Sequence, residues 1–105
     1  MKKIFIIGTI TSKIPQEFKE IEENLKKDFS NQVISTYDEH SQGNEKMNWV
    51  FNNIENSSLI VALFPQISFG TSFELGYSIA KDKNILLITL EDVYEKIKFR
   101  KCTKK

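Results

Sequence analysis

The 105-residue chain has few of the residues that support several common kinds of protein chemistry. Its single cysteine, Cys102, lies in a polar tail and excludes an internal disulfide, which favours a reducing, cytoplasmic setting. One histidine, His40, and one remote cysteine do not make a set of metal ligands, so we expect no metal and no other cofactor. No apolar run approaches the ~20 residues of a membrane span. The basic start, Met1–Lys3, precedes an apolar run that stops at Gly8, which is too short for a signal peptide.

The charges of the chain nearly cancel, with a formal net charge of +1 at pH 7. This balance gives no electrostatic reason to expect nucleic acid as a partner. Basic residues gather at positions 96–105, but no aromatic or motif context accompanies them, and we interpret them as a solvated tail. A chain of this length predicts one domain, 1–105, that buries about 65 % of the surface its unfolded form exposes.

Apolar patterns of two kinds alternate along the chain. Short apolar runs predict strands at 3–8, 33–36, 59–64 and 85–90. Stretches with helical periodicity predict helices at 15–29, 44–56, from 71 onward, and at 91–99. This alternation predicts an α/β fold: a single-domain, flavodoxin- or Rossmann-like parallel sheet with strand order 2-1-3-4 and helices on both faces. Ligands of such sheets bind beyond the carboxyl ends of the strands, where the strand order reverses.

The stretch from Ser57 to Lys83 is the most informative part of the sequence. Leu59–Phe64 has the pattern of a strand buried on both faces. Pro65 and Gly70 bracket a loop that continues neither the strand nor the helix after it. The expected buried face of that helix comprises Leu75, Gly76, Ile79 and Ala80. We expect Glu74, in its first turn, to project over the carboxyl end of the sheet.

Spacing alone leaves two interpretations of Glu74 open. The run Thr71–Glu74 fits a capping box, in which Thr71 caps the helix and Glu74 returns a hydrogen bond to its backbone. The helix macrodipole also favours an acid at this place. The other interpretation is a catalytic carboxylate. The loop before it, Ser68–Ser72, is likewise either a set of turn and capping residues or an anion site at a helix N-terminus.

Three polar residues, Asp38, Glu39 and His40, follow the second predicted strand at the same edge of the sheet. Each is a candidate acid or hydrogen-bond donor to a ligand. A surface loop without a chemical role is the alternative interpretation.

Two segments, IFIIGTI and SSLIVALFPQISFGTSFELGYSIAKDKNILLI, carry a specific resemblance. They resemble the nucleoside 2-deoxyribosyltransferase family and, within it, the branch that contains 2'-deoxynucleoside 5'-monophosphate N-hydrolases. The shared pattern is an aliphatic strand, a loop of the form S-x-G, and a helix that opens with E-L-G before an alanine and a strand. The matching residues here are Ser68, Gly70, Glu74, Leu75, Gly76, Ala80 and the strand 85–88.

The resemblance implies cleavage or transfer at the N-glycosidic bond of a (deoxy)nucleoside or nucleoside 5'-monophosphate. Glu74 would attack C1' and form a glycosyl-enzyme ester, which water or a second nucleobase resolves. The substrate-binding candidates are Gly8, Thr9, Ile10, Ser58, Ser68, Gly70 and Ser72. The resemblance also implies a homodimer or larger assembly, and the simple core pattern leaves three aromatic residues available for such a contact: Trp49, Phe69 and Tyr77.

The chain departs from the family pattern at two positions. Ser58 stands where the family has an aspartate before the central strand, and Phe5 stands where a tyrosine is common. Serine cannot act as a general acid near neutral pH. General acid–base catalysis typically accelerates a reaction by about 10²–10⁴-fold, so its loss would be large. Two functions therefore stay open. One is an altered N-glycosidase or deoxyribosyltransferase in which Asp38, Glu39 or His40 replaces the acid, and the other is a non-catalytic, regulatory nucleotide-binding relative.

Overall fold

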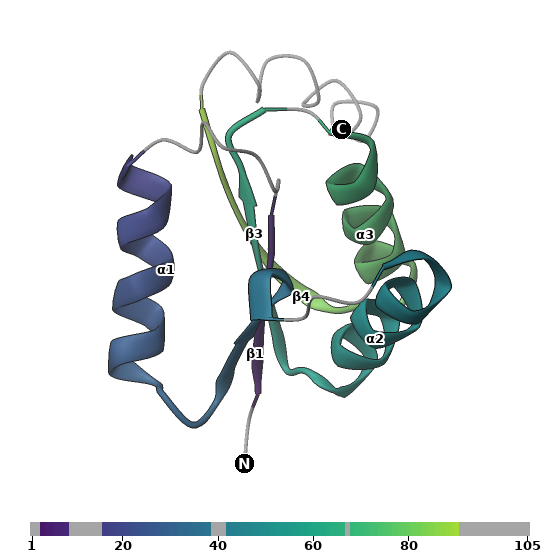
Figure 1. Ribbon diagram of the computed structural model, residues 1–105, viewed down its shortest axis with the longest axis horizontal. Helices are drawn as coiled ribbons and strands as arrows, with labels where there is room; N and C mark the ends of the chain where they lie inside the picture. The colour runs from purple at the N-terminus through teal and green to yellow at the C-terminus, as the bar shows by residue number, and fades with distance from the viewer. Residues whose placement is uncertain (1–2, 9–15, 39–41, 67, 91–105) are drawn as a thin grey trace.

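The computed structural model of the chain describes residues 3–8, 16–38, 42–66 and 68–90. Strands and helices alternate along these residues, and Figure 1 shows how they are arranged. The strands are β1 (Ile4–Gly8), β2 (Val33–Ser35), β3 (Leu59–Phe64) and β4 (Asn84–Thr89). The helices are α1 (Gln16–Asp28), α2 (Gly43–Asn56) and α3 (Phe69–Ala80), with a short 3-10 helix, η1, at Thr36–Asp38.

The four strands form one parallel sheet in the order β2-β1-β3-β4. In its register, Ile6 of β1 lies opposite Val61 of β3, which in turn lies opposite Leu86 of β4. The predicted fold class and strand order are therefore confirmed. The reversal of strand order falls between β1 and β3, as the sequence predicts. The helix predicted at 91–99 lies outside the described residues.

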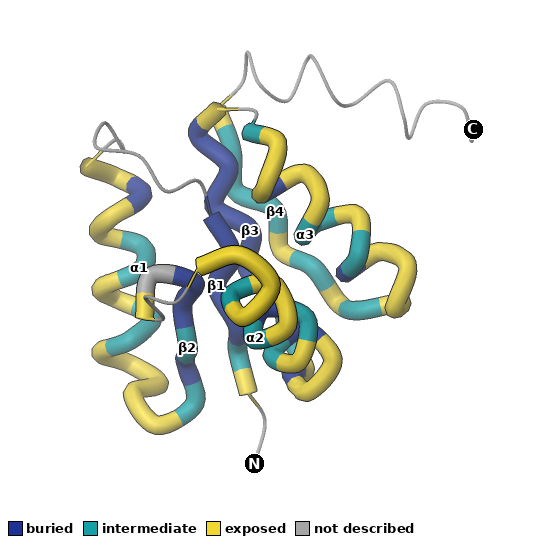
Figure 2. The backbone as a smooth tube through the Cα atoms, turned by 45° about the vertical axis from the view of Figure 1, so that its right-hand side comes forward, coloured by how far each residue is buried: buried dark blue, intermediate teal, exposed yellow. Residues whose placement is uncertain are grey.

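The sheet separates two apolar layers. Alternate residues of β1 and β3 point to opposite faces, so Phe5 and Ile60 pack with α2 and α3, whereas Ile6 and Val61 pack with α1. Figure 1 shows α1 on one side of the sheet and the other two helices across from it. Figure 2 shows β1 and β3 buried between these layers. Burial on both faces explains why the two strands are continuous apolar runs.

Helix α3 begins earlier than the sequence suggests. Its N-cap is Ser68, whose Oγ accepts a hydrogen bond from the Thr71 backbone N–H at 3.3 Å. The predicted capping box at Thr71–Glu74 is therefore wrong, because Thr71 already lies inside the helix. The first turn of α3 contains no acid, and Glu74 lies in the second turn.

The predicted buried face of α3 is only partly right: Leu75 is half-buried and packs against the core, but the other three positions are not buried. Thr71 and Ser78 are buried, whereas Gly76 and Ala80 are exposed and Ile79 is 63 % exposed. The apolar pattern misleads here because the inward face carries hydroxyl groups. Ser78 satisfies its hydroxyl within the helix by donating to the Glu74 carbonyl at 2.9 Å. Two small hydroxyl residues, Thr71 and Ser78, thus occupy inward positions of α3 that the sequence does not predict to be buried.

Candidate functional site

A hollow of about 170 Å³ lies between the beginnings of α2 and α3, and we refer to it as the α2–α3 hollow. Its lining consists of Gly43, Lys46, Met47, Val50, Phe51, Gly70, Phe73 and Glu74. Helix α3 follows the carboxyl end of β3, and α2 follows the carboxyl end of β2 after η1. The two helix beginnings therefore meet at the sheet edge where ligands of parallel α/β folds bind.

Glu74 is the acid of this hollow. Burial raises the pKa of its carboxyl from 4.5 to about 7, and the positive charge of Lys46 offsets part of that rise. At neutral pH the carboxyl is therefore close to half ionised. A carboxyl in a cleft with a strongly perturbed pKa is a feature typical of functional sites.

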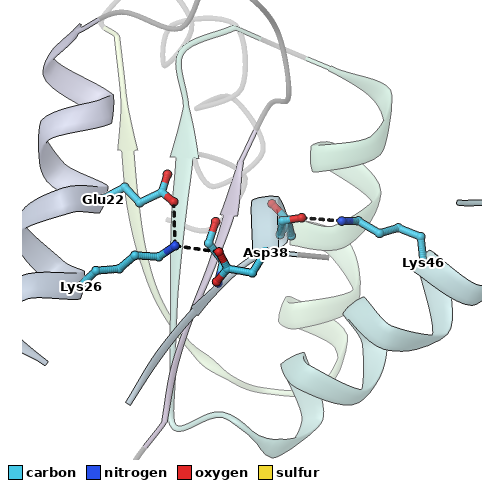
Figure 3. A network of polar contacts seen from close by, with 6 residues as sticks. Glu22, Lys26, Asp38 and Lys46 are labelled. Carbon is cyan, nitrogen blue, oxygen red and sulfur yellow. Dashed lines mark hydrogen bonds and ion pairs between the residues drawn. The ribbon is translucent and has the colours of Figure 1, made fainter. Parts of the chain in front are cut away.

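Lys46 comes from the start of α2 and has a defined position above the strand ends. Its Nζ donates a hydrogen bond to the Thr36 carbonyl of η1, an interaction that Figure 3 shows reaching across from α2. The same ammonium lies 5.3 Å from the centre of the Trp49 ring. Trp49, predicted to be partly exposed or in a subunit contact, is half-buried and packs edge-to-face on Phe5 at 5.6 Å.

The loop and first turn of α3 bring two predicted substrate residues to this edge. Gly70 lines the hollow, and Ser68 caps the helix beside it. Ser72 is exposed, and its backbone N–H donates to the Ser68 carbonyl at 3.0 Å. Gly8 ends β1 opposite Leu63, so it lies at the same carboxyl edge of the sheet.

Other predicted site residues lie elsewhere. Ser58 is exposed at the amino end of β3, where its backbone N–H donates to the Lys3 carbonyl at 2.8 Å. Because β3 runs away from this point toward Glu74, Ser58 lies at the opposite edge of the sheet from the hollow. The structure therefore does not bring Ser58 and Glu74 together. Four further candidates, Thr9, Ile10, Glu39 and His40, lie outside the described residues.

Asp38 is engaged in a different contact network. One carboxylate oxygen accepts from the Ser35 backbone N–H at 2.9 Å, and the other accepts from Lys26 Nζ at 2.8 Å. Lys26 also lies 3.4 Å from Glu22 on α1. Figure 3 shows this network on the α1 side of η1. Asp38 thus fastens the end of β2 to α1, and it does not line the α2–α3 hollow.

The sequence analysis did not predict the residues that α2 contributes to the lining of the hollow. Lys46, Met47 and Phe51 line the hollow with Glu74, yet they come from a separate helix and share no motif with it. One signal was present in the sequence. A lysine near the start of a helix faces the positive end of the macrodipole, so it needs a compensating contact.

Within the part of the chain that the structure describes, no group of three or more His, Cys, Asp or Glu side chains is placed to hold a metal ion. Among the helices of the described residues, none is long and apolar enough to cross a membrane.

Comparison with solved structures identifies a protein of similar fold, a 2-desoxiribosyltransferase from Leishmania mexicana. The TM-score is 0.61 and the sequence identity is 21 % over 83 % of this chain. The present chain spans 64 % of the length of that structure. No family model and no curated protein matches the sequence. At this identity the comparison shows that the two proteins share a fold.

Proposed function

We propose that the protein cleaves or transfers the N-glycosidic bond of (deoxy)nucleosides or nucleoside 5'-monophosphates, with Glu74 as the nucleophile. The observation that carries this proposal is the position of Glu74. It is a half-buried carboxyl with a pKa of about 7, in a hollow at the carboxyl edge of a parallel sheet. The fold shared with a deoxyribosyltransferase and the S-x-G and E-L-G motifs support the same reaction class.

The proposed reaction has two steps. The Glu74 carboxylate attacks C1', the bond from C1' to the base nitrogen breaks, and its electron pair leaves with the base, which takes up a proton. The resulting glycosyl ester is then attacked at C1' by water or by a second nucleobase, which releases the carboxylate. Glu39 and His40 stay candidates for the proton donor. Asp38 is a weaker candidate because Ser35 and Lys26 occupy its oxygens.

The walls of the hollow suit the sugar rather than the whole nucleotide. Its volume is below the ~300–1,000 Å³ of most ligand pockets. Apolar side chains, including Val50, Phe51 and Phe73, line most of it beside the Glu74 carboxyl. We therefore place the deoxyribose in the hollow. A 5'-phosphate would then lie against Ser68 and the first N–H groups of α3, where the helix dipole favours an anion.

We further propose that the protein acts as a cytoplasmic homodimer or larger assembly. Apolar side chains around the mouth of the hollow remain exposed: Phe69 is 96 % exposed, and Met47 and Phe73 are also exposed. Burying such rings against a second copy of the chain would be strongly favourable. A copy that covers them would also enclose the hollow. The third aromatic residue predicted for a contact, Tyr77, is stacked on Phe51 within the chain.

A non-catalytic nucleotide-binding role is the second candidate. One observation favours it: among the described residues that line the hollow, Glu74 is the only carboxyl. Retaining glycosidases use two carboxyl groups, and the second serves as acid and base. In this alternative the hollow binds a nucleotide and Glu74 positions its sugar without attacking C1'.

Glu74→Gln tests the enzymatic proposal directly. Wild-type protein is incubated with a panel of nucleosides and their 5'-monophosphates, and free base is quantified. We expect Glu74→Gln to stay folded and to lose nearly all turnover, because an amide has no anionic oxygen to attack C1'. Glu45→Gln, an exposed glutamate of α2, is the matched control and should retain wild-type turnover.

Two results would decide against Glu74 as nucleophile. Release of base that survives undiminished in Glu74→Gln would assign the chemistry to another group. Wild-type protein that binds nucleotides and releases no base from any of them would favour the non-catalytic alternative.

A further inference from the structure

Two helices place opposite charges in the α2–α3 hollow. Lys46 lines it from α2 and Glu74 lines it from α3. Among the described residues of the lining, these are the only two charged side chains. A residue of each charge therefore borders one small, largely apolar space, and an electrostatic interaction across such a space is stronger than it is in water.

Among the described residues, the elements with the most contacts to α3 place no second charged side chain in the lining of the hollow. Helix α3 contacts α2, β1 and β3, and the residues of β1 and β3 are all uncharged. On α2, Glu45 is exposed, and Glu55 accepts a hydrogen bond from the Tyr77 hydroxyl near the other end of α3. Within the described chain, Lys46 is thus the charged group that acts on Glu74, in agreement with its effect on the pKa of that carboxyl.

Lys46 is held at this place by groups other than Glu74. Its Nζ donates to the Thr36 carbonyl at the carboxyl end of β2, and it lies over the face of the Trp49 ring. Trp49 is in turn fixed by its edge-to-face contact with Phe5, which is fully buried in the sheet. The ammonium therefore keeps stabilising contacts whether Glu74 is charged or neutral.

We propose that Lys46 is a positioning residue for Glu74: its anchored ammonium increases the fraction of the half-buried carboxyl that is in the anionic form, which can act as a nucleophile. This inference rests on the proposed function, because only a reacting carboxylate needs to be anionic. Burial alone favours the neutral acid, which cannot attack C1'. When the glycosyl ester forms, Glu74 loses its charge, and the Thr36 carbonyl and the Trp49 ring continue to stabilise Lys46.

The test is a direct titration of Glu74 in the 105-residue chain. Glutamate side chains are labelled with ¹³C, the Glu74 carboxyl signal is assigned by its loss in Glu74→Gln, and its chemical shift is followed against pH. An opposite charge at close range shifts a carboxyl pKa by about 1–3 pH units. We expect Lys46→Met to raise the Glu74 midpoint by roughly 0.5–1 pH unit, since Lys46 is partly solvated. Lys46→Arg, which keeps the charge, should stay near the wild-type value.

Lys81→Met is the matched control. Lys81 also lies over an aromatic ring, 5.5 Å from the centre of Tyr77, and 3.6 Å from a carboxylate, Glu55. Its substitution should leave the Glu74 midpoint unchanged. If Lys46→Met fails to fold, Lys46→Gln removes the charge while keeping a donor for the Thr36 carbonyl. An unchanged Glu74 midpoint in the folded uncharged variant would overturn the proposal, as would an equal shift in Lys81→Met.

A kinetic readout separates this proposal from the proposed function. If the wild type releases base, the acidic limb of kcat/KM against pH should move upward in Lys46→Met by the same amount as the carboxyl titration. If the wild type releases no base, the proposed function fails, and the titration still decides whether Lys46 controls the charge of Glu74.

Discussion

The two faces of the sheet each place a lysine beside a carboxylate, but the surroundings of the two pairs differ. On the α1 face, Lys26 Nζ and Asp38 lie 2.8 Å apart, and both side chains are more than a third exposed. On the other face, Lys46 and Glu74 line an apolar hollow, and burial raises the pKa of the Glu74 carboxyl to about 7. The solvated ion pair connects helix α1 to η1 at the end of β2, whereas the half-buried Glu74 carboxyl lies close to its ionisation midpoint at neutral pH.

This difference shows that one small fold combines a carboxylate held by stabilising contacts with a carboxyl whose charge is opposed by burial. Asp38 has both oxygens engaged, by a backbone N–H and by Lys26, and so contributes to the structure of β2 and η1. Glu74 lies where burial opposes its charge, so its ionisation costs folding free energy. A carboxyl whose ionisation opposes folding at neutral pH is a candidate for a functional role.

The largest expected effect on stability is a gain from replacing Glu74. Because its folded pKa is raised above 4.5, ionisation of Glu74 opposes folding, and the loss of stability develops as pH rises from about 4.5 to 7. Glu74→Gln removes this cost, so we expect a gain of up to about 3 kcal/mol in the free energy of unfolding at pH 8 and little change near pH 4. Urea denaturation at both pH values measures it. An equal effect at the two pH values would show that the carboxyl is not perturbed by burial.

The next effect is a difference in binding affinity between ligands with and without a phosphate, at the beginning of α3. If Ser68 and the helix N-terminus receive a 5'-phosphate, nucleoside monophosphates should bind more tightly than nucleosides, because each charge-assisted hydrogen bond contributes about 1.5–3 kcal/mol. Salt should weaken this preference. Isothermal titration calorimetry at two ionic strengths tests it, preferably with Glu74→Gln so that no substrate is consumed. Equal affinity for both ligands would leave Ser68 with its capping role alone.

The smallest effect concerns the Lys26–Asp38 ion pair on the α1 face. Breaking it should lower the free energy of unfolding, whereas Glu74→Gln should raise it. Asp38→Ala removes the acceptor of the Ser35 N–H and breaks the ion pair with Lys26. We expect a loss of about 1–2 kcal/mol, because a solvated ion pair adds little and the backbone hydrogen bond adds most of the effect. Lys26→Met, which breaks only the ion pair, should cost less in the same denaturation experiment. A larger loss in Lys26→Met would assign the stability to the charges instead.

The sheet could be predicted from sequence because its signals are local and its connections are constrained. The apolar run Leu59–Phe64 has the bounds of β3 as observed, and alternating strands and helices leave few possible strand orders. The start of α3 could not be predicted in the same way. Ser68 and Thr71 are both good N-cap residues, and the structure uses Ser68, which lets Thr71 pack in the interior.

The sequence predicted the position of only the part of the hollow that a motif marks, and the role of that part stays a prediction. The run around Glu74 indicated a carboxylate at the carboxyl edge of the sheet, and the structure has Glu74 there. Lys46 could not be predicted as its neighbour, because their proximity depends on how α2 and α3 pack across one face of the sheet. Asp38, singled out for its place after β2, forms its contacts with α1 instead, a tertiary preference that sequence position does not reveal.

Trapping the covalent intermediate tests the nucleophilic role of Glu74 most directly. The protein is mixed with a cleavable deoxynucleoside 5'-monophosphate, quenched in acid within the first turnover, digested, and analysed by mass spectrometry. We predict that the peptide containing Glu74 gains the mass of the deoxyribosyl phosphate and that this adduct is absent from Glu74→Gln. Base release with no adduct on that peptide, or the same adduct in Glu74→Gln, would contradict the account.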